Sequence, residues 1–217
     1  MKLSRIIYWT FCVIVLLASQ ANAQIDPKAD KLVKRARDKF YSFPDFSANI
    51  AFSLENKALK EKQPAKSGYV KIKKNKYHVI FPDQELFCDG KTVWVYLKTN
   101  NEVNISDFDP NESLNIDKVF ALYDKGMKSR LDNAETIGGV STQKISLFPN
   151  NNKTEYTRVE VWINATTDLV HRFKLVNKNG TTYQYDLSAI KTNTLIPDSE
   201  FVFDAQKYPK VNIVDLR

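Results

Sequence analysis

Hydrophobic residues recur at every second position through most of this chain, which is the spacing of strands that bury one face. Residues 46–54 (FSANIAFSL) show the alternation most clearly, and turn signals such as Asp89-Gly90 and Gly138-Gly139 separate later segments. The pattern predicts a mainly β fold in which about eleven strands form one antiparallel meander. A sheet of that length must curl into a barrel or half-barrel. The predicted strands are residues 46–54, 68–73, 76–81, 85–88, 92–97, 102–106, 130–137, 140–148, 156–163, 169–176 and 181–190, with tail segments at 200–203 and 211–214.

Two segments have helical spacing instead. The first runs from Asp26 to Tyr41, with Asp26 as the N-cap and Pro27 at the first helical position. A second, short helix is predicted over residues 115–124. Both helices would cover the open mouth or the concave face of a curled sheet. The apolar face of the first helix repeats at i, i+4 and i+8, at Leu32, Ala36 and Phe40.

The first 23 residues have the features of a secretory signal. Basic residues precede an apolar run over residues 6–18, and Ala21-Asn22-Ala23 fits a cleavage site. The alternative is a transmembrane anchor, but this run is shorter than the ~20 apolar residues that span a bilayer. We expect residues 1–23 to be cleaved and residues 24–217 to form a single domain outside the cytoplasm.

The chain has 32 Lys+Arg against 25 Asp+Glu, with 43% hydrophobic residues, and this composition excludes disordered, collagen-like and coiled-coil proteins. Lysines cluster at positions 71, 73, 74 and 76, with Tyr69 and Tyr77 among them. Such a cluster is typical of nucleic-acid binding. Because we expect export, we predict no nucleic-acid partner. A solvated strand face, or a docking surface for an anionic membrane or partner, is the preferred interpretation.

Residues suited to catalysis are scarce. His78 and His171 are the only histidines, and neither has a partner at ligand spacing. No zinc-protease, thiol-redox, nucleophile-elbow or phosphate-loop motif is present. Cys88, the one cysteine beyond the predicted signal, is flanked by apolar residues and is interpreted as a core or lining residue. We therefore expect no enzymatic activity, no metal and no cofactor.

One strand is apolar on both faces. In residues 92–97, Val93, Val95 and Leu97 alternate with Trp94 and Tyr96, so each face must contact something. A helix on one side and an apolar ligand cavity on the other would explain the pattern. A plain packed barrel core explains it equally well.

Four segments carry a family pattern in the same order along the chain. Residues 46–50 (FSANI) are similar to F-x-A-x-F, and residues 68–74 (GYVKIKK) to G-x-L-x-V-K-R. Residues 89–96 (DGKTVWVY) match D-G-K-x-L-W-x-Y, and the ending from residue 201 (FVF, then PKVNIVDLR) is similar to F-x-F followed by P-x-G-V-x-V-x-D-x-R. The chain thus resembles the outer-membrane lipoprotein carrier proteins of Gram-negative bacteria, LolA and its relatives.

The resemblance implies an unclosed, eleven-stranded antiparallel barrel with helices as a lid over an apolar cavity. It implies a monomeric periplasmic chaperone that takes acylated lipoproteins from an inner-membrane ABC transporter and delivers them to an outer-membrane receptor. The receptor of this fold is itself a lipoprotein, and no cysteine lies at the predicted cleavage junction, which favours the carrier. The alternative is an exported protein on the same scaffold that binds another lipid, senses envelope state or acts as an enzyme.

The resemblance also suggests a site. Lys74 stands where the family has an arginine that latches the lid, and lysine cannot reproduce the bidentate fork of arginine. A one-residue slip in strand register would exchange the two faces, and a packed core would use the same residues. The residues predicted to line the cavity or its lid contact are Phe46, Ile50, Tyr77, Val79, Phe81, Trp94 and Tyr96 on strands, with Leu32, Ala36 and Phe40 on the first helix.

Overall fold

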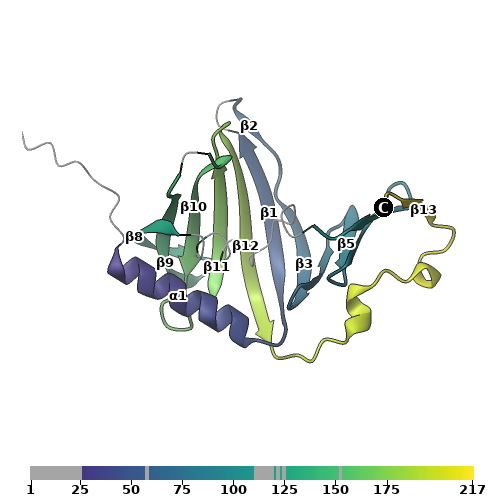
Figure 1. The fold of residues 1–217 in the computed structure, drawn as a ribbon, viewed down its shortest axis with the longest axis horizontal. Helices are drawn as coiled ribbons and strands as arrows, with labels where there is room; N and C mark the ends of the chain where they lie inside the picture. Colours follow the sequence, from purple (N-terminus) through teal and green to yellow (C-terminus); the bar gives the residue numbers. More distant parts are fainter. Residues whose placement is uncertain (1–25, 57–58, 110–119, 121–122, 124–125, 152) are drawn as a thin grey trace, which may run out of the picture.

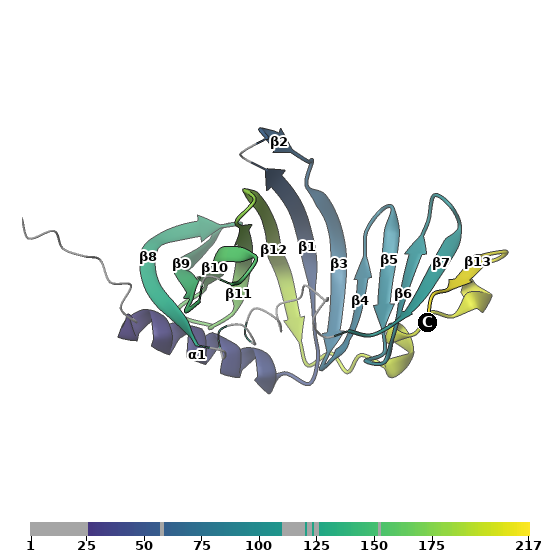
Figure 2. The ribbon, with the colours of Figure 1, turned by 45° about the horizontal axis from the view of Figure 1, so that its top comes forward.

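The computed structural model describes residues 26–56, 59–109, 120, 123, 126–151 and 153–217. Within this part of the chain, thirteen strands join one sheet that curls without closing (Figures 1 and 2). The prediction of a mainly β, unclosed fold is confirmed. The strands are β1 (Phe46–Asn56), β2 (Glu61–Lys62), β3 (Lys66–Lys73), β4 (Lys76–Ile80), β5 (Gln84–Cys88), β6 (Thr92–Leu97), β7 (Glu102–Asp107), β8 (Met127–Ile137), β9 (Val140–Pro149), β10 (Tyr156–Ile163), β11 (Val170–Asn177), β12 (Thr181–Thr192) and β13 (Asn212–Asp215).

The strand order differs from the single meander expected. The sheet runs β13-β7-β6-β5-β4-β3-β1-β12-β11-β10-β9-β8, and β2 pairs only with β1. Two meanders therefore meet where β1 pairs antiparallel with β12, and the chain passes from β7 near one edge to β8 at the other. The last strand, β13, pairs with β7 in parallel. Local alternation cannot reveal such long-range pairings.

One α-helix, α1 (Pro27–Ser42), lies along the half of the sheet formed by β8 to β12 (Figure 2). Asp26 caps it by accepting hydrogen bonds from the backbone N–H groups of Lys28 and Ala29. Its buried residues pack against concave-face residues of β9 to β12 in one hydrophobic core. The second predicted helix, residues 115–124, lies outside the described residues except for Phe120 and Tyr123, which are buried in this core.

The C-terminal segment covers the other, convex face of β4 to β7. It contains two short 3-10 helices, η1 (Asp198–Phe201) and η2 (Ala205–Lys207), where a strand was predicted over residues 200–203. That prediction is wrong, because Phe201 and Phe203 are buried by side-chain packing without strand pairing. Phe203 forms a second core with Phe87 and Val103, against which Trp94 and Tyr96 pack.

No helix among the described residues is both long enough and apolar enough to cross a membrane.

Candidate functional site

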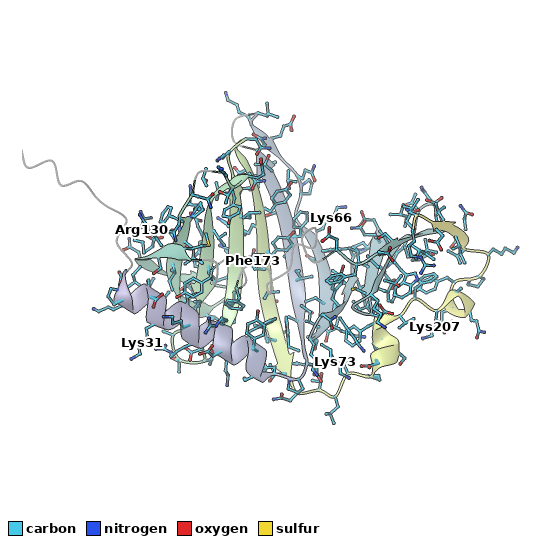
Figure 3. All side chains as sticks on the ribbon, in the orientation of Figure 1. Lys31, Lys66, Lys73, Arg130, Phe173 and Lys207 are labelled. Carbon is cyan, nitrogen blue, oxygen red and sulfur yellow. The ribbon has the colours of Figure 1, made fainter. Side chains whose placement is uncertain are left out.

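An apolar cavity of about 460 Å³ opens on the concave face, between the strands on either side of β1. This volume falls in the range of small-molecule binding sites. Apolar side chains of β1, β3 to β6, β11 and β12 supply most of the wall, and Figure 3 shows Phe173 in the middle of the curled sheet. The lining residues are Phe46, Ile50, Phe52, Lys66, Val70, Ile72, Tyr77, Val79, Phe81, Gln84, Leu86, Val93, Ser106, Asp107, Phe108, Asp109, Phe173, Tyr185 and Leu187.

Strand register explains which side chains reach the cavity. Residues directly opposite each other on paired strands share a face. Val79 pairs with Val70 on one side and with Leu86 on the other, and all three line the cavity. In the same way Phe52 of β1 lies opposite Tyr185 of β12, with ring centroids 5.0 Å apart. The concave face thus carries a continuous apolar wall from β12 to β6.

Five predicted site residues line this cavity: Phe46, Ile50, Tyr77, Val79 and Phe81. Gly68 makes room for one of them, because a Cβ at Gly68 would lie 2.7 Å from Cδ1 of Phe81 and 2.2 Å from the carbonyl oxygen of Ile80. The sequence reasoning missed the residues of β11 and β12, which reach the cavity only through the long-range β1–β12 pairing.

Trp94 and Tyr96 do not line the cavity, which corrects the assignment made from the sequence. Trp94 lies opposite Phe87, whereas its neighbour Val93 lies opposite Cys88 and faces the cavity. The ring of Tyr96 lies 4.5 Å from that of Tyr208, on the convex face. Both faces of β6 are apolar, so alternation alone could not decide which one meets the ligand space.

The predicted helix residues lie beside the cavity. Leu32 and Ala36 are buried in the core beneath α1. Phe40 packs edge-to-face on Phe46 at 5.5 Å, and Phe46 is part of the cavity wall. The helix therefore contacts the wall at Phe46 while its other apolar residues fill the neighbouring half of the sheet.

Lys74, the candidate latch, is exposed in the β3–β4 turn with a left-handed φ of +56°. Among the described residues it has no ion-pair partner. It lines a second pocket of about 270 Å³ together with Phe40, Tyr41, Phe43, Asp45, Phe46, Ile72 and Asn75. Phe46 and Ile72 line both this pocket and the main cavity, so the two spaces adjoin.

The two tyrosines of the wall favour their neutral forms, and Lys66, Asp107 and Asp109 add ionisable side chains to the same lining. Burial raises the pKa of Tyr77, and the nearby Cys88 thiol adds to the shift. Burial also raises the pKa of Tyr185 to about 12. Cys88 itself is fully buried, and burial raises its pKa as well. Over the residues described, no group of His, Cys, Asp or Glu side chains could hold a metal ion. Such a lining suits binding of an apolar ligand by burial.

Three of the four clustered lysines form ion pairs within the molecule. Lys71 Nζ lies 2.6 Å from Glu200 Oε2, and Lys73 and Lys76 both pair with Asp198, at 2.8 and 2.7 Å. Figure 3 shows Lys73 beside η1. These pairs fix the C-terminal segment to the convex face, so only Lys74 of the cluster matches the docking surface expected from the sequence.

Comparison with known proteins identifies relatives. A family model described as outer membrane lipoprotein carrier protein LolA matches residues 55–204. A search of curated proteins finds no match.

Several solved structures share the fold. An uncharacterized conserved protein from Thermus thermophilus has a TM-score of 0.55 at 13% identity, over 87% of this chain and 99% of that one. The Mycobacterium tuberculosis lipoprotein LppX has a TM-score of 0.51 at 17% identity, over 79% and 98%. MucB has a TM-score of 0.51 at 13% identity, over 83% and 64%. At these identities the likeness concerns the fold.

Proposed function

The chain belongs to the LolA family of outer membrane lipoprotein carrier proteins, and on that premise we propose that it carries lipoproteins by enclosing their acyl chains in the concave cavity. The observation that carries the proposal is the continuous apolar wall of an open cavity of about 460 Å³. A packed core would have filled this space with side chains.

The energetics of acyl chains call for such a site. Each methylene withdrawn from water is worth about 0.8 kcal/mol, so one ~16-carbon chain corresponds to roughly 12 kcal/mol. A lipoprotein cannot leave a membrane at a useful rate unless that surface stays covered. The cavity wall offers apolar contact from β3 to β6 on one side of β1 and from β11 and β12 on the other. The phenols of Tyr77 and Tyr185 are neutral and add no charge that would oppose an acyl chain.

We further propose the cellular setting. The protein would work as a monomer in the periplasm, receiving acylated lipoproteins from an inner-membrane ABC transporter and passing them to an outer-membrane receptor or the outer membrane itself. It would act by binding alone, as a chaperone without enzymatic activity.

The decisive test is a release assay. Spheroplasts from the source organism, carrying labelled newly made lipoproteins, are incubated with the purified protein, and the soluble fraction is examined. We expect labelled lipoprotein in that fraction in complex with this protein. If a folded preparation releases none, the carrier role is wrong, and a carrier of another lipid on the same scaffold becomes the function to test.

A pair of variants ties release to the cavity. Val79→Glu places a charge on the cavity wall, and desolvating that charge against an acyl chain opposes loading. Ile80→Glu makes the same change one residue along β4, at a position that does not line the cavity. We expect Val79→Glu to lose at least about tenfold in lipoprotein release and Ile80→Glu to keep it. Equal release by two folded variants would remove the cavity from the mechanism.

A further inference from the structure

A large apolar side chain is held out in solvent between β12 and η1. Leu195 is 83% exposed and has a φ of +57°. The left-handed region is unfavourable for a bulky L-residue. An outlier of this kind at an exposed leucine points to a function for its projection.

Buried hydrogen bonds hold Leu195 in this position. The Asp45 carboxylate is buried, and it accepts hydrogen bonds from the backbone N–H groups of Thr194 at 2.7 Å and Ile196 at 3.2 Å, and from the Thr194 hydroxyl at 2.9 Å. On the other side, Lys73 Nζ donates to the Ile196 carbonyl at 2.8 Å. Both residues that flank Leu195 are therefore anchored, and the loop presents the leucine on a fixed support.

The surroundings of Leu195 are apolar and basic. The segment between β12 and η1 runs along the same end of the sheet as the C-terminal end of α1 (Figure 1). Tyr41, at that end of α1, is 53% exposed. Asp45, which holds the residues on both sides of Leu195, lines the second pocket together with Tyr41 and Lys74. We call the set Lys39, Tyr41, Lys74 and Leu195 the basic rim.

The charges of the basic rim are available to a partner. Its two lysines, Lys39 and Lys74, are exposed, and neither pairs with a described carboxylate, although Lys39 lies over the ring of Phe43 at 5.3 Å. Asp45 is buried and accepts several hydrogen bonds, and Asp198 is shared between Lys73 and Lys76. Asp38, the exposed carboxylate next to Lys39, is paired with Arg37 at 3.0 Å. The exposed charge at this end is therefore positive.

The rim also borders ligand space. Tyr41 and Lys74 line the second pocket, which adjoins the main cavity through Phe46 and Ile72. An acyl chain that crossed this pocket would enter the molecule beside Tyr41 and Lys74.

We propose that the basic rim docks the protein on an anionic phospholipid bilayer. Leu195 and Tyr41 would enter the interface between headgroups and acyl chains, where leucine buries apolar surface and tyrosine keeps its hydroxyl wet. The lysines would lie over lipid phosphates, each adding attraction to an anionic surface. A single projecting leucine on a surface with two exposed lysines fits a bilayer better than the flat, shape-matched core of a protein interface. Docking is a property of this surface, separate from the identity of the cargo.

Vesicle binding tests the docking. Protein purified from the envelope extract of cells that express the full chain is sedimented with vesicles of phosphatidylglycerol and phosphatidylethanolamine, and separately with phosphatidylcholine vesicles. We expect binding to the anionic vesicles, weakened by salt. Leu195→Asp should weaken it about tenfold, and Lys74→Glu about fivefold.

Leu59→Asp is the matched control, because Leu59 is also an exposed leucine, at 65%, but lies in the turn after β1. It should bind vesicles like the wild type. In addition, Leu195→Trp should shift its emission to the blue on anionic vesicles, whereas Leu59→Trp should not. The proposal would be overturned if the wild type did not bind vesicles, or if Leu195→Asp and Leu59→Asp lost vesicle binding equally. Binding to polyanions without binding to vesicles would also overturn it and would indicate an acidic protein partner instead. Lipoprotein release, measured in parallel, reports on the cavity, so failure of docking and failure of the carrier role remain distinguishable.

Discussion

The two halves of the sheet bury opposite faces. In the half formed by β8 to β12, α1 fills the concave face and the convex face is charged, with Lys144, Arg172 and Lys174 lying 5.0–5.5 Å from the Trp162 ring. In the half formed by β3 to β7, the concave face lines the open cavity together with residues of β1, β11 and β12, and an aromatic cluster around Phe203 covers the convex face. One continuous sheet thus has its main core inside the curl on one side and a smaller core outside it on the other.

This difference shows how the molecule keeps a cavity open. A sheet needs one well-covered apolar face, and in the β3–β7 half the C-terminal segment provides that cover from outside. Part of the concave face can then stay open to a ligand, although Val70 and Phe81 are also buried in the main core. If so, substitutions in the convex aromatic cluster should affect stability, and substitutions in the cavity wall should mainly affect binding.

The largest effect is expected for Phe203→Ala. The Phe203 ring is buried, 4.6 Å from Tyr208 and 5.7 Å from Phe87. Removing it should lower the free energy of unfolding by about 4 kcal/mol, the range for buried phenylalanines. Urea denaturation measures this change, and lipoprotein release by the folded variant should persist. A loss below about 1 kcal/mol would show that the convex cluster does not hold this half together.

Two leucines, one in each half, allow the packing of the two halves to be compared directly. Leu147, in β9, is fully buried in the filled half, whereas Leu86 lines the cavity and is only half-buried. We expect Leu147→Ala to lower the free energy of unfolding by about 3 kcal/mol and Leu86→Ala by about 1 kcal/mol. The midpoints of urea denaturation, compared at an unchanged m-value, give both free-energy changes. Equal losses would mean that the cavity wall is packed as tightly as the core.

A glycine at the cavity should show a smaller effect. In Gly68→Ala the new Cβ would meet the Ile80 carbonyl oxygen and the Phe81 ring, so β3 and β4 must shift. Overpacking of this kind costs about 2 kcal/mol, and displacement of Phe81 should also weaken ligand binding. Ser67→Ala, an exposed change at the adjacent position, serves as the control in thermal unfolding and release assays. Unchanged release by Gly68→Ala would show that the position of Phe81 is unimportant.

Secondary structure was largely predictable here because alternation is a local signal. The predictions for β6 and β10 match their observed bounds, Thr92–Leu97 and Tyr156–Ile163. The two-residue β2 is too short to carry a pattern. Residues 200–203 alternate like a strand, yet Phe201 and Phe203 satisfy their burial through aromatic contacts from a 3-10 turn and the residues after it. Tertiary packing overrode the local pattern there.

The site was only partly predictable, for reasons of register and topology. Val79 and Ile50 could be placed because their strands alternate clearly. Trp94 could not, because both faces of β6 are apolar; the cross-strand pair of Val93 with Cys88 would have identified the cavity face. Tyr185 enters the wall only because β12 pairs with β1, and such distant pairings leave no local trace.

The pH dependence of stability offers the finest comparison, since one histidine lies in each half. His78, in β4, stacks on Phe87 at 4.0 Å with Nε2 3.3 Å from Glu85, and its Nδ1 has no hydrogen-bond partner among the described residues. Burial lowers the pKa of His78, partly offset by Glu85. Burial likewise lowers the pKa of His171, in β11.

A lowered histidine pKa means that the unfolded chain binds more protons than the folded one between the folded pKa and about 6.5. Stability is therefore fully present above about pH 6.5 and falls as the pH drops through that window, by at most about 1.4 kcal/mol per pH unit for each histidine. Urea denaturation of His78→Gln and His171→Gln at several pH values separates the two contributions. We expect the free energy of unfolding to depend less on pH in each variant than in the wild type. The reduction should be larger in His78→Gln, because the His78 imidazole lies in the covered convex cluster. An unchanged pH dependence of the free energy of unfolding in His78→Gln would mean that the convex aromatic cluster opens to water before the sheet unfolds. The cluster would then hold this half less firmly than the contacts of Phe203 indicate.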